Sequence, residues 1–220
     1  MEPTVIYEDD ALVVIDKPAG IIVHPDGRHD YPALTTWLEQ RYKEFHLVHR
    51  IDRETSGVLV IAKTVQAFEF LKSQFQNREI KKTYRAFVHG PFKEERGVID
   101  KPIGSSRGGA GPRSATLPKG TTRDALTTYR VIANSKDGAY VEVFPKTGRT
   151  HQIRVHFSAI QHPVIGDTLY ASGRPKLLGF TRLALHALSL SFTHPNGSEL
   201  SFEAPLPQDF LKAEQDLRAL

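Results

Sequence analysis

The sequence has no cysteine and only one methionine and one tryptophan among its 220 residues. Without cysteine the chain cannot form disulfides, use a thiolate nucleophile or bind zinc through sulfur, so its chemistry must come from oxygen, nitrogen or imidazole groups. The start, Met1-Glu2-Pro3-Thr4, lacks the basic and apolar segments of a signal peptide, and no apolar run approaches the ~18 residues of a membrane span. These absences predict a cytoplasmic protein.

The composition is that of a folded globular protein. Hydrophobic residues make up 40% of the chain, enough at this length to bury a sizeable core in one large domain or two closely packed lobes. Lysine and arginine outnumber aspartate and glutamate by 29 to 25, which gives a net charge of +4. This excess suits a polyanionic partner but is too small to require one.

Short runs rich in β-branched residues alternate with a few amphipathic segments. Runs typical of strands are residues 11–15, 21–23, 57–62, 82–89, 125–132 and 139–144, and the pair 188–193 and 198–202 flanking Asn196-Gly197. Apolar residues occur at helical spacing within 32–42, after Thr64 and after Thr150. Thr64 and Thr150 can each cap the helix that follows. The pattern predicts one α+β domain over residues 1–220, with a mixed, largely antiparallel sheet in two lobes and a central cleft.

Two segments differ in character from the rest. Residues 101–123 contain five glycines, three prolines, five lysines or arginines and no acidic residue, which predicts a basic loop or a mobile arm. The segment His49-Arg-Ile-Asp-Arg-Glu-Thr-Ser-Gly57 places Asp52 between two arginines, near a histidine, on a turn before a buried strand. These cations would favour the ionised carboxylate. Taken alone, such an aspartate is more often a salt-bridged loop residue than a catalytic one.

Several long motifs, in a fixed order along the chain, indicate a more specific role for Asp52. These are KPAGIIVH from Lys17, HRIDRETSGVLVIAKT from His49, KKTY from Lys81, PKTGRTHQIRVH from Pro145, HPVIGD from His162 and RLALHA from Arg182. Together they closely resemble the ordered motifs of the RluA family of pseudouridine synthases, over about residues 7 to 205. Many relatives in this family carry an N-terminal S4 domain. Here the motifs begin within the first twenty residues, so we expect no S4 domain.

The resemblance implies an enzyme that isomerises uridines in ribosomal or transfer RNA without a metal or cofactor. It implies that Asp52 is catalytic, that Tyr84 stacks on the target uracil and that Arg154 pairs with Asp52 in one basic cleft. Arg50 matches the position that can fill the gap left by a flipped base. Weaker expectations of RNA or substrate contact fall on four further residues: Thr147, Arg149, His151 and Gln152. The basic segment 101–123 is either a contact for the RNA backbone or a solvated loop.

Two other functions remain open at this point. A non-catalytic RNA-binding or assembly factor could keep the fold, although the intact Asp52, Tyr84 and Arg154 set counts against it. A glycosidase would need a second, separated acid, and Glu54 is only two residues from Asp52. The ten histidines show no HExxH or similar pattern, so we expect no metal site. Without a heptad or repeat that asks for a partner, we expect a monomer.

Overall fold

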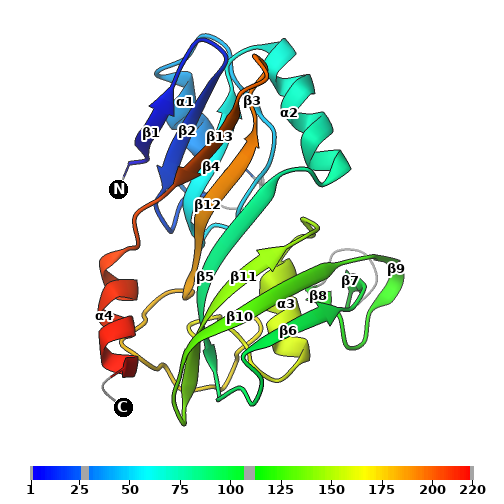
Figure 1. The fold of residues 1–220 in the computed structure, drawn as a ribbon, viewed down its shortest axis with the longest axis vertical. Helices are drawn as coiled ribbons and strands as arrows, with labels where there is room; N and C mark the ends of the chain where they lie inside the picture. Colours follow the sequence, from blue (N-terminus) through cyan, green and yellow to red (C-terminus); the bar gives the residue numbers. More distant parts are fainter. Residues whose placement is uncertain (1, 26–29, 107–111, 219–220) are drawn as a thin grey trace. The chain divides into compact units, whose positions relative to one another are not determined.

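The computed structural model describes residues 2–25, 30–106 and 112–218 (Figure 1). The chain forms two compact units. The first consists of Met1–Lys82 and His186–Pro205, and the second of Thr83–Leu185 and Leu206–Leu220. None of the helices in the described part of the chain has the length and apolar character needed to cross a membrane.

The first unit is built on a mixed sheet. Its strands are β1 (Thr4–Glu8), β2 (Leu12–Lys17), β3 (His46–Leu47), β4 (Ser56–Ala62), β12 (Leu185–Thr193, in this unit from His186 on) and β13 (Glu199–Glu203). The order is β1-β2-β4-β12, with β3 also pairing with β4 and β13 with β12. Strands β4 and β12 are parallel, and the remaining pairs are antiparallel.

Burial explains the apolar runs of this unit. All seven residues of β4 are buried, and Leu12–Ile15 in β2 are completely inaccessible. A strand that is covered on both faces has apolar residues at successive positions instead of at every second one, as β4 does. Two helices, α1 (Leu34–Glu39) and α2 (Val65–Asn77), complete the unit. The predicted cap of α2 is confirmed, because the Thr64 hydroxyl accepts the Ala67 N–H at 3.1 Å.

The strand predicted at residues 21–23 is wrong. Ile22 forms only an isolated bridge with Ala33, in which the Ile22 N–H binds the Pro32 carbonyl and the Ile22 carbonyl accepts the Leu34 N–H. This segment therefore pairs with the loop before α1. Its hydrophobic residues reflect burial, with Val23 only 3% exposed, and burial alone does not make a strand.

The second unit contains an antiparallel sheet. Its strands are β5 (Lys81–His89, in this unit from Thr83 on), β6 (Arg96–Asp100), β10 (Leu126–Asn134) and β11 (Gly138–Pro145). They lie in the order β5-β11-β10-β6. Helices α3 (Gln152–Ala159) and α4 (Gln208–Arg218) both contact β10 and β11. The sequence pattern did not predict β1, β3, β6 or α4.

The strand register assigns the two helices to opposite faces of this sheet. Phe87 and Tyr140 lie directly opposite each other, with ring centroids 4.3 Å apart, and Phe210 of α4 contacts Phe87 at 5.4 Å. On the other face, Tyr129 contacts Phe157 of α3 at 5.4 Å. Because neighbouring residues of a strand point to opposite faces, Tyr84 lies on the α3 face, in line with Val143 and Tyr129.

The segment 101–123 is more ordered than predicted. Its described residues form a small antiparallel sheet, β8-β7-β9, from β7 (Ile103–Ser105), β8 (Arg113–Ser114) and β9 (Lys119–Arg123). Residues 107–111 of the predicted loop lie outside the described residues. Ile103 is buried with Ala125 and with Val155 of α3, and this small apolar cluster anchors the sheet. The loop prediction failed because strands of two to five residues among many glycines and prolines leave little periodic signal.

Candidate active site

Asp52 lies in a turn immediately before β4. Its carbonyl oxygen accepts the N–H of the buried Thr55 at 3.1 Å. The next carbonyl, that of Arg53, accepts the Gly20 N–H at 2.8 Å and a hydrogen bond from the Lys17 ammonium at 3.2 Å. The backbone of the turn is therefore held from both sides, while the Asp52 residue itself stays partly exposed.

Lys17 is the anchor of this turn. It ends β2, is 0% exposed, and donates from Nζ to the carbonyls of Pro18 at 2.8 Å, Ile21 at 3.0 Å and Arg53 at 3.2 Å. An ammonium group has three N–H donors, and three carbonyls offset the cost of taking its charge out of water. One buried lysine thus connects β2, the Pro18–Ile21 turn and the Asp52 turn.

The expectation that His49 is a cation beside Asp52 is wrong. Burial, with a smaller contribution from the positive charge of Lys82, lowers the pKa of His49 to about 3. Its Nε2 accepts the Val60 N–H at 3.1 Å, which requires an unprotonated nitrogen, and its ring stacks on Phe75 of α2 at 4.6 Å. His49 is a neutral structural residue that fastens the start of the motif to α2 and β4.

The two arginines that flank Asp52 differ in their surroundings. Arg53 forms an ion pair with Glu54, with Nε and Oε1 2.7 Å apart, and its guanidinium lies 3.9 Å from the centre of the Tyr31 ring. Glu54 is therefore engaged by its neighbour. Arg50 is exposed, which leaves it accessible to a substrate.

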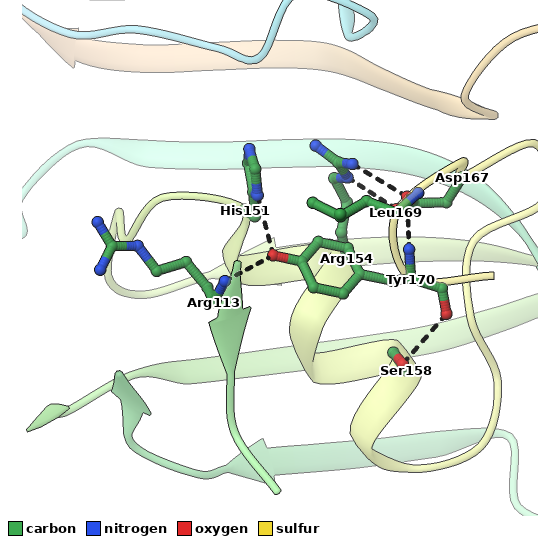
Figure 2. A network of polar contacts seen from close by, with 7 residues as sticks. All are labelled: Arg113, His151, Arg154, Ser158, Asp167, Leu169 and Tyr170. Carbon is green, nitrogen blue, oxygen red and sulfur yellow. Dashed lines mark hydrogen bonds and ion pairs between the residues drawn. The ribbon is translucent and has the colours of Figure 1, made fainter. Parts of the chain in front are cut away.

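In the second unit, Arg154 on α3 is held by a carboxylate. Its Nε and Nη2 donate to the two oxygens of Asp167, at 2.7 and 2.9 Å (Figure 2). The Asp167 side chain is 0% exposed and that of Arg154 is 11% exposed. Asp167 Oδ1 also accepts the N–H groups of Leu169 and Tyr170, so one carboxylate both caps a turn and fixes the guanidinium.

Tyr170 extends this network toward the start of α3. Its ring lies 5.2 Å from the Arg154 guanidinium, and its hydroxyl contacts His151 Nδ1 at 2.9 Å and accepts the Arg113 N–H at 3.1 Å (Figure 2). The Arg113 side chain points away from the network. Tyr170 therefore connects β8 to the turn before α3, and its ring lies next to Arg154.

The turn that precedes α3 is not capped as predicted. The N-cap is His151, in the left-handed conformation with φ 57°, and no side chain caps the helix there. Instead, Gln152 Oε1 accepts the Thr147 hydroxyl at 2.6 Å and the Arg149 N–H at 3.0 Å. Its Nε2 donates to Leu126 and Thr127. Thr147 and Gln152 are both buried, so they shape the turn from within.

The candidate residues divide between the two units. Tyr84 lies on the sheet face covered by α3, and Arg149, His151 and Arg154 lie at the first turn of that helix or just before it. Asp52 and Arg50 belong to the first unit. The expected pairing of Asp52 with Arg154 stays a prediction. Within the described ranges there is no group of three or more histidine and acidic residues that could hold a metal ion.

Comparison with known proteins decides the family. The model of the RNA pseudouridylate synthase family matches residues 11–159. The chain belongs to this family. It is 38% identical to the "Uncharacterized RNA pseudouridine synthase YlyB" of Bacillus subtilis, over 99% of this chain and 74% of that protein. It is 37% identical to the "Ribosomal large subunit pseudouridine synthase D" of Zymomonas mobilis, over 93% of this chain and 69% of that protein.

Solved structures agree with this assignment. "Human RNA Pseudouridylate Synthase Domain Containing 4" superposes with a TM-score of 0.79 at 29% identity, over 97% of this chain and 92% of that chain. The α+β fold with a mostly antiparallel sheet, predicted from the sequence, is thereby confirmed. As an RNA pseudouridine synthase, the chain is an isomerase: the N1–C1′ bond of uridine breaks and a C5–C1′ bond forms, with no net change in redox state.

Three residues around the pseudouridine synthase motifs had no role in the sequence reading. Lys17 and Asp167 stand inside quoted motifs, and Tyr170 follows Asp167 by three residues. The sequence did contain a signal for them, because a charged residue next to an apolar run is a candidate for burial. Lys17 follows the apolar run of β2, and Asp167 follows Val164-Ile165-Gly166. A charged residue that is fully buried needs dedicated partners, and those partners came from distant segments.

Proposed function

We propose that this synthase isomerises uridine in large-subunit ribosomal RNA, with Asp52 as its catalytic residue. The names of the relatives support the substrate class. The observation that carries the role of Asp52 is the anchored turn: a fully buried lysine and two backbone hydrogen bonds hold the carbonyls of Asp52 and Arg53. A site that must position one carboxylate against a ribose gains from such rigidity.

Asp52 starts the glycosidic cleavage in this proposal. Its carboxylate displaces N1 at C1′, adds to C6 of the uracil, or removes a ribose proton so that N1 leaves and a glycal forms. Tyr84 stacks on the extruded uracil, a contact worth about 1–3 kcal/mol that offsets part of the unstacking cost. Arg154 pairs with Asp52 and keeps it ionised when RNA excludes water from the site.

The remaining candidates serve the RNA. Arg50 fills the gap left by the flipped base, and its exposure supports that role. Arg149 and His151 contact the RNA, and the buried Thr147 and Gln152 act by holding the turn that presents them. The enzyme acts as a monomer in the cytoplasm, without metal or cofactor.

The test of the catalytic role compares two neighbouring carboxylates. Asp52→Asn abolishes pseudouridine formation in a large-subunit ribosomal RNA transcript, while RNA binding stays near the wild-type level. Glu54→Gln is the matched control, because it removes an adjacent charge that is paired with Arg53, and it keeps most of the activity. Turnover by Asp52→Asn at a rate close to wild type would rule out Asp52.

The substrate class has its own test. Pseudouridines are mapped in total RNA from cells with and without the gene, and the site that disappears identifies the target. Loss of a site only in transfer RNA contradicts the ribosomal assignment. Loss of no site favours a non-catalytic role.

A further inference from the structure

A basic pocket of about 490 Å³ lies between the small sheet β8-β7-β9 and the turn before α3, within the second unit. Its lining includes three arginines, Arg113, Arg123 and Arg149, and three hydroxyl-bearing residues, Ser105, Thr121 and Thr150. No lining residue is acidic. Arg113, Arg123 and Arg149 also have no ion pair with an acidic residue in the described part of the chain, so their charge is available to an anion.

Two of these arginines come from the two outer strands of the small sheet, and both line the pocket. Ser105 of β7 pairs with Arg113 of β8, and Ile103, two residues earlier, pairs with Arg123 of β9. The register of β7 with β9 shifts between Ile103 and Ser105, so the shared position of the two arginines follows from the pocket lining and not from strand alternation. The central strand β7 separates the strands that carry Arg113 and Arg123. Arginines from both outer strands can contact more than one phosphate of an RNA strand.

The third arginine comes from the opposite wall and is held in place. Arg149 Nε donates to the Asp124 carbonyl at 3.0 Å, and its backbone N–H donates to the Gln152 side chain at 3.0 Å. The turn stands at the amino end of α3, where the helix dipole favours negative charge. Tyr170 fixes the distance between the walls, because its hydroxyl accepts the Arg113 N–H and contacts His151.

The lining chemistry separates phosphate recognition from base recognition. Small-molecule pockets are mostly apolar, whereas Ile103 is the one large apolar side chain in this lining. RNA bases are read by stacking on aromatic rings, and no aromatic residue lines the pocket. Neither Asp52 nor Tyr84 is part of the lining. The pocket therefore has the groups that bind sugar–phosphate and none of those proposed to act on the uracil.

We infer that this pocket binds backbone phosphates of the RNA substrate at nucleotides other than the target uridine. The inference rests on the proposed function in one respect, that RNA is the substrate. It assigns β7, β8 and β9 a positioning role: contacts to phosphates orient the RNA without reading its sequence. Arg113, Arg123 and Arg149 supply charge, and the three hydroxyls supply hydrogen bonds to phosphate oxygens.

The experiment measures RNA binding as a function of salt for the double variant Arg113→Gln/Arg123→Gln. The probe is a large-subunit ribosomal RNA transcript. Each lost phosphate contact reduces the slope of log Kobs against log salt by about 0.7–0.9, so the slope falls by about 1.4–1.8. The affinity near 0.1 M salt falls by about tenfold or more. Melting temperatures within a few degrees of wild type show that the variant is folded.

The matched control is Arg96→Gln/Lys136→Gln, which removes the same charge from exposed positions of the second unit outside the pocket. Its salt slope stays at the wild-type value. Equal slopes for the pocket variant and this control would overturn the inference. Inorganic phosphate at matched ionic strength is a second probe: a pocket variant that loses phosphate binding and keeps its RNA affinity identifies a free-anion site and also overturns it.

The design separates this inference from the catalytic proposal. Binding is measured in both the wild-type and the Asp52→Asn backgrounds, so it does not depend on turnover. If Asp52→Asn remains active while the pocket variant has a smaller slope of log Kobs against log salt, phosphate binding by the pocket is supported and the catalytic role of Asp52 is contradicted. If the pocket variant binds RNA like wild type while wild type converts uridine, the pocket fails and the proposed function stands.

Discussion

Asp167 binds the guanidinium of Arg154 through two hydrogen bonds of 2.7 and 2.9 Å, with its own side chain completely buried. The same carboxylate accepts two backbone N–H groups from the turn that carries Tyr170. Arg154 is therefore oriented before any substrate arrives. A guanidinium that is already fixed loses less entropy when it meets a second partner.

Asp167→Asn tests this orientation. The amide oxygen can still cap the 167–170 turn, but the amide nitrogen now faces an arginine N–H and the buried charge pair is broken. We expect a loss of about 3 kcal/mol in the free energy of unfolding and a clear fall in kcat. Urea unfolding and single-turnover rates measure the two effects.

The control for Asp167 is Asp209→Asn, which breaks the Arg182–Asp209 pair of the same unit, where the side chains are 18% and 32% exposed. This more exposed pair should cost ~1 kcal/mol or less and leave kcat unchanged. An Asp167→Asn enzyme with wild-type kcat would show that Arg154 does not need this partner.

Lys17→Met tests the anchor of the Asp52 turn. Methionine fills a similar volume, but it leaves the carbonyls of Pro18, Ile21 and Arg53 without the Nζ donor. We expect about 2–3 kcal/mol of destabilisation, since each buried acceptor that loses its partner costs on the order of 1 kcal/mol or more. We also expect kcat to fall, because the turn that carries Asp52 loosens.

The control for Lys17 is Lys72→Met on α2, where the lysine forms an exposed pair with Glu69. Its effect on unfolding should stay within about 0.5 kcal/mol. Similar stabilities for the two variants would contradict the anchoring role of Lys17.

Gly57→Ala should destabilise the start of β4, which directly follows the Asp52 turn. Gly57 has φ +114°, and a Cβ there would lie 2.1 Å from the Ala187 carbonyl oxygen, on the strand that pairs with β4 in parallel. Backbone cannot give way at this distance, so we expect more than ~3 kcal/mol of destabilisation or failure to fold. Gly173→Ala has φ +79° and no atom within 4 Å of the added Cβ, so it isolates backbone strain and should cost about 1 kcal/mol. Thermal unfolding compares the two.

The neutral state of His49 predicts a pH dependence of stability. Its pKa is about 3 in the folded protein, against about 6.5 for an unperturbed histidine. Between these pH values the unfolded chain therefore binds a proton that the folded chain does not. Stability from this residue is complete above pH 6.5 and is lost as the pH falls toward 3. The loss is about 2 kcal/mol at pH 5, since each pH unit is worth about 1.4 kcal/mol.

His49→Gln checks this dependence, because the glutamine amide oxygen can still accept the Val60 N–H without titrating. The difference in unfolding free energy between wild type and variant, measured at pH 7.5 and pH 5, isolates His49 from His89 and His156. Burial also lowers the pKa of those two histidines, but they are present in both proteins. A difference that does not change with pH would contradict a neutral His49.

Local sequence determined the elements whose pattern is complete within a few residues. The apolar run of β4, the Thr64 cap of α2 and the helical spacing after Thr64 all predicted what the structure contains. The ordered motifs identified the family for the same reason, because they are read along the chain. The strand at 21–23 and the Thr150 cap failed where hydrophobicity or residue type suggested a role that pairing and hydrogen bonding did not support.

Tertiary structure alone decided which charges are used and how. The sequence placed three cations around Asp52, but desolvation makes His49 neutral and Glu54 binds Arg53. It marked Arg154 without revealing Asp167 as its partner, and it described residues 101–123 as a loop where three short strands form one wall of a basic pocket. Burial and hydrogen bonding between segments far apart in the chain set these outcomes, and neither quantity is a property of local sequence.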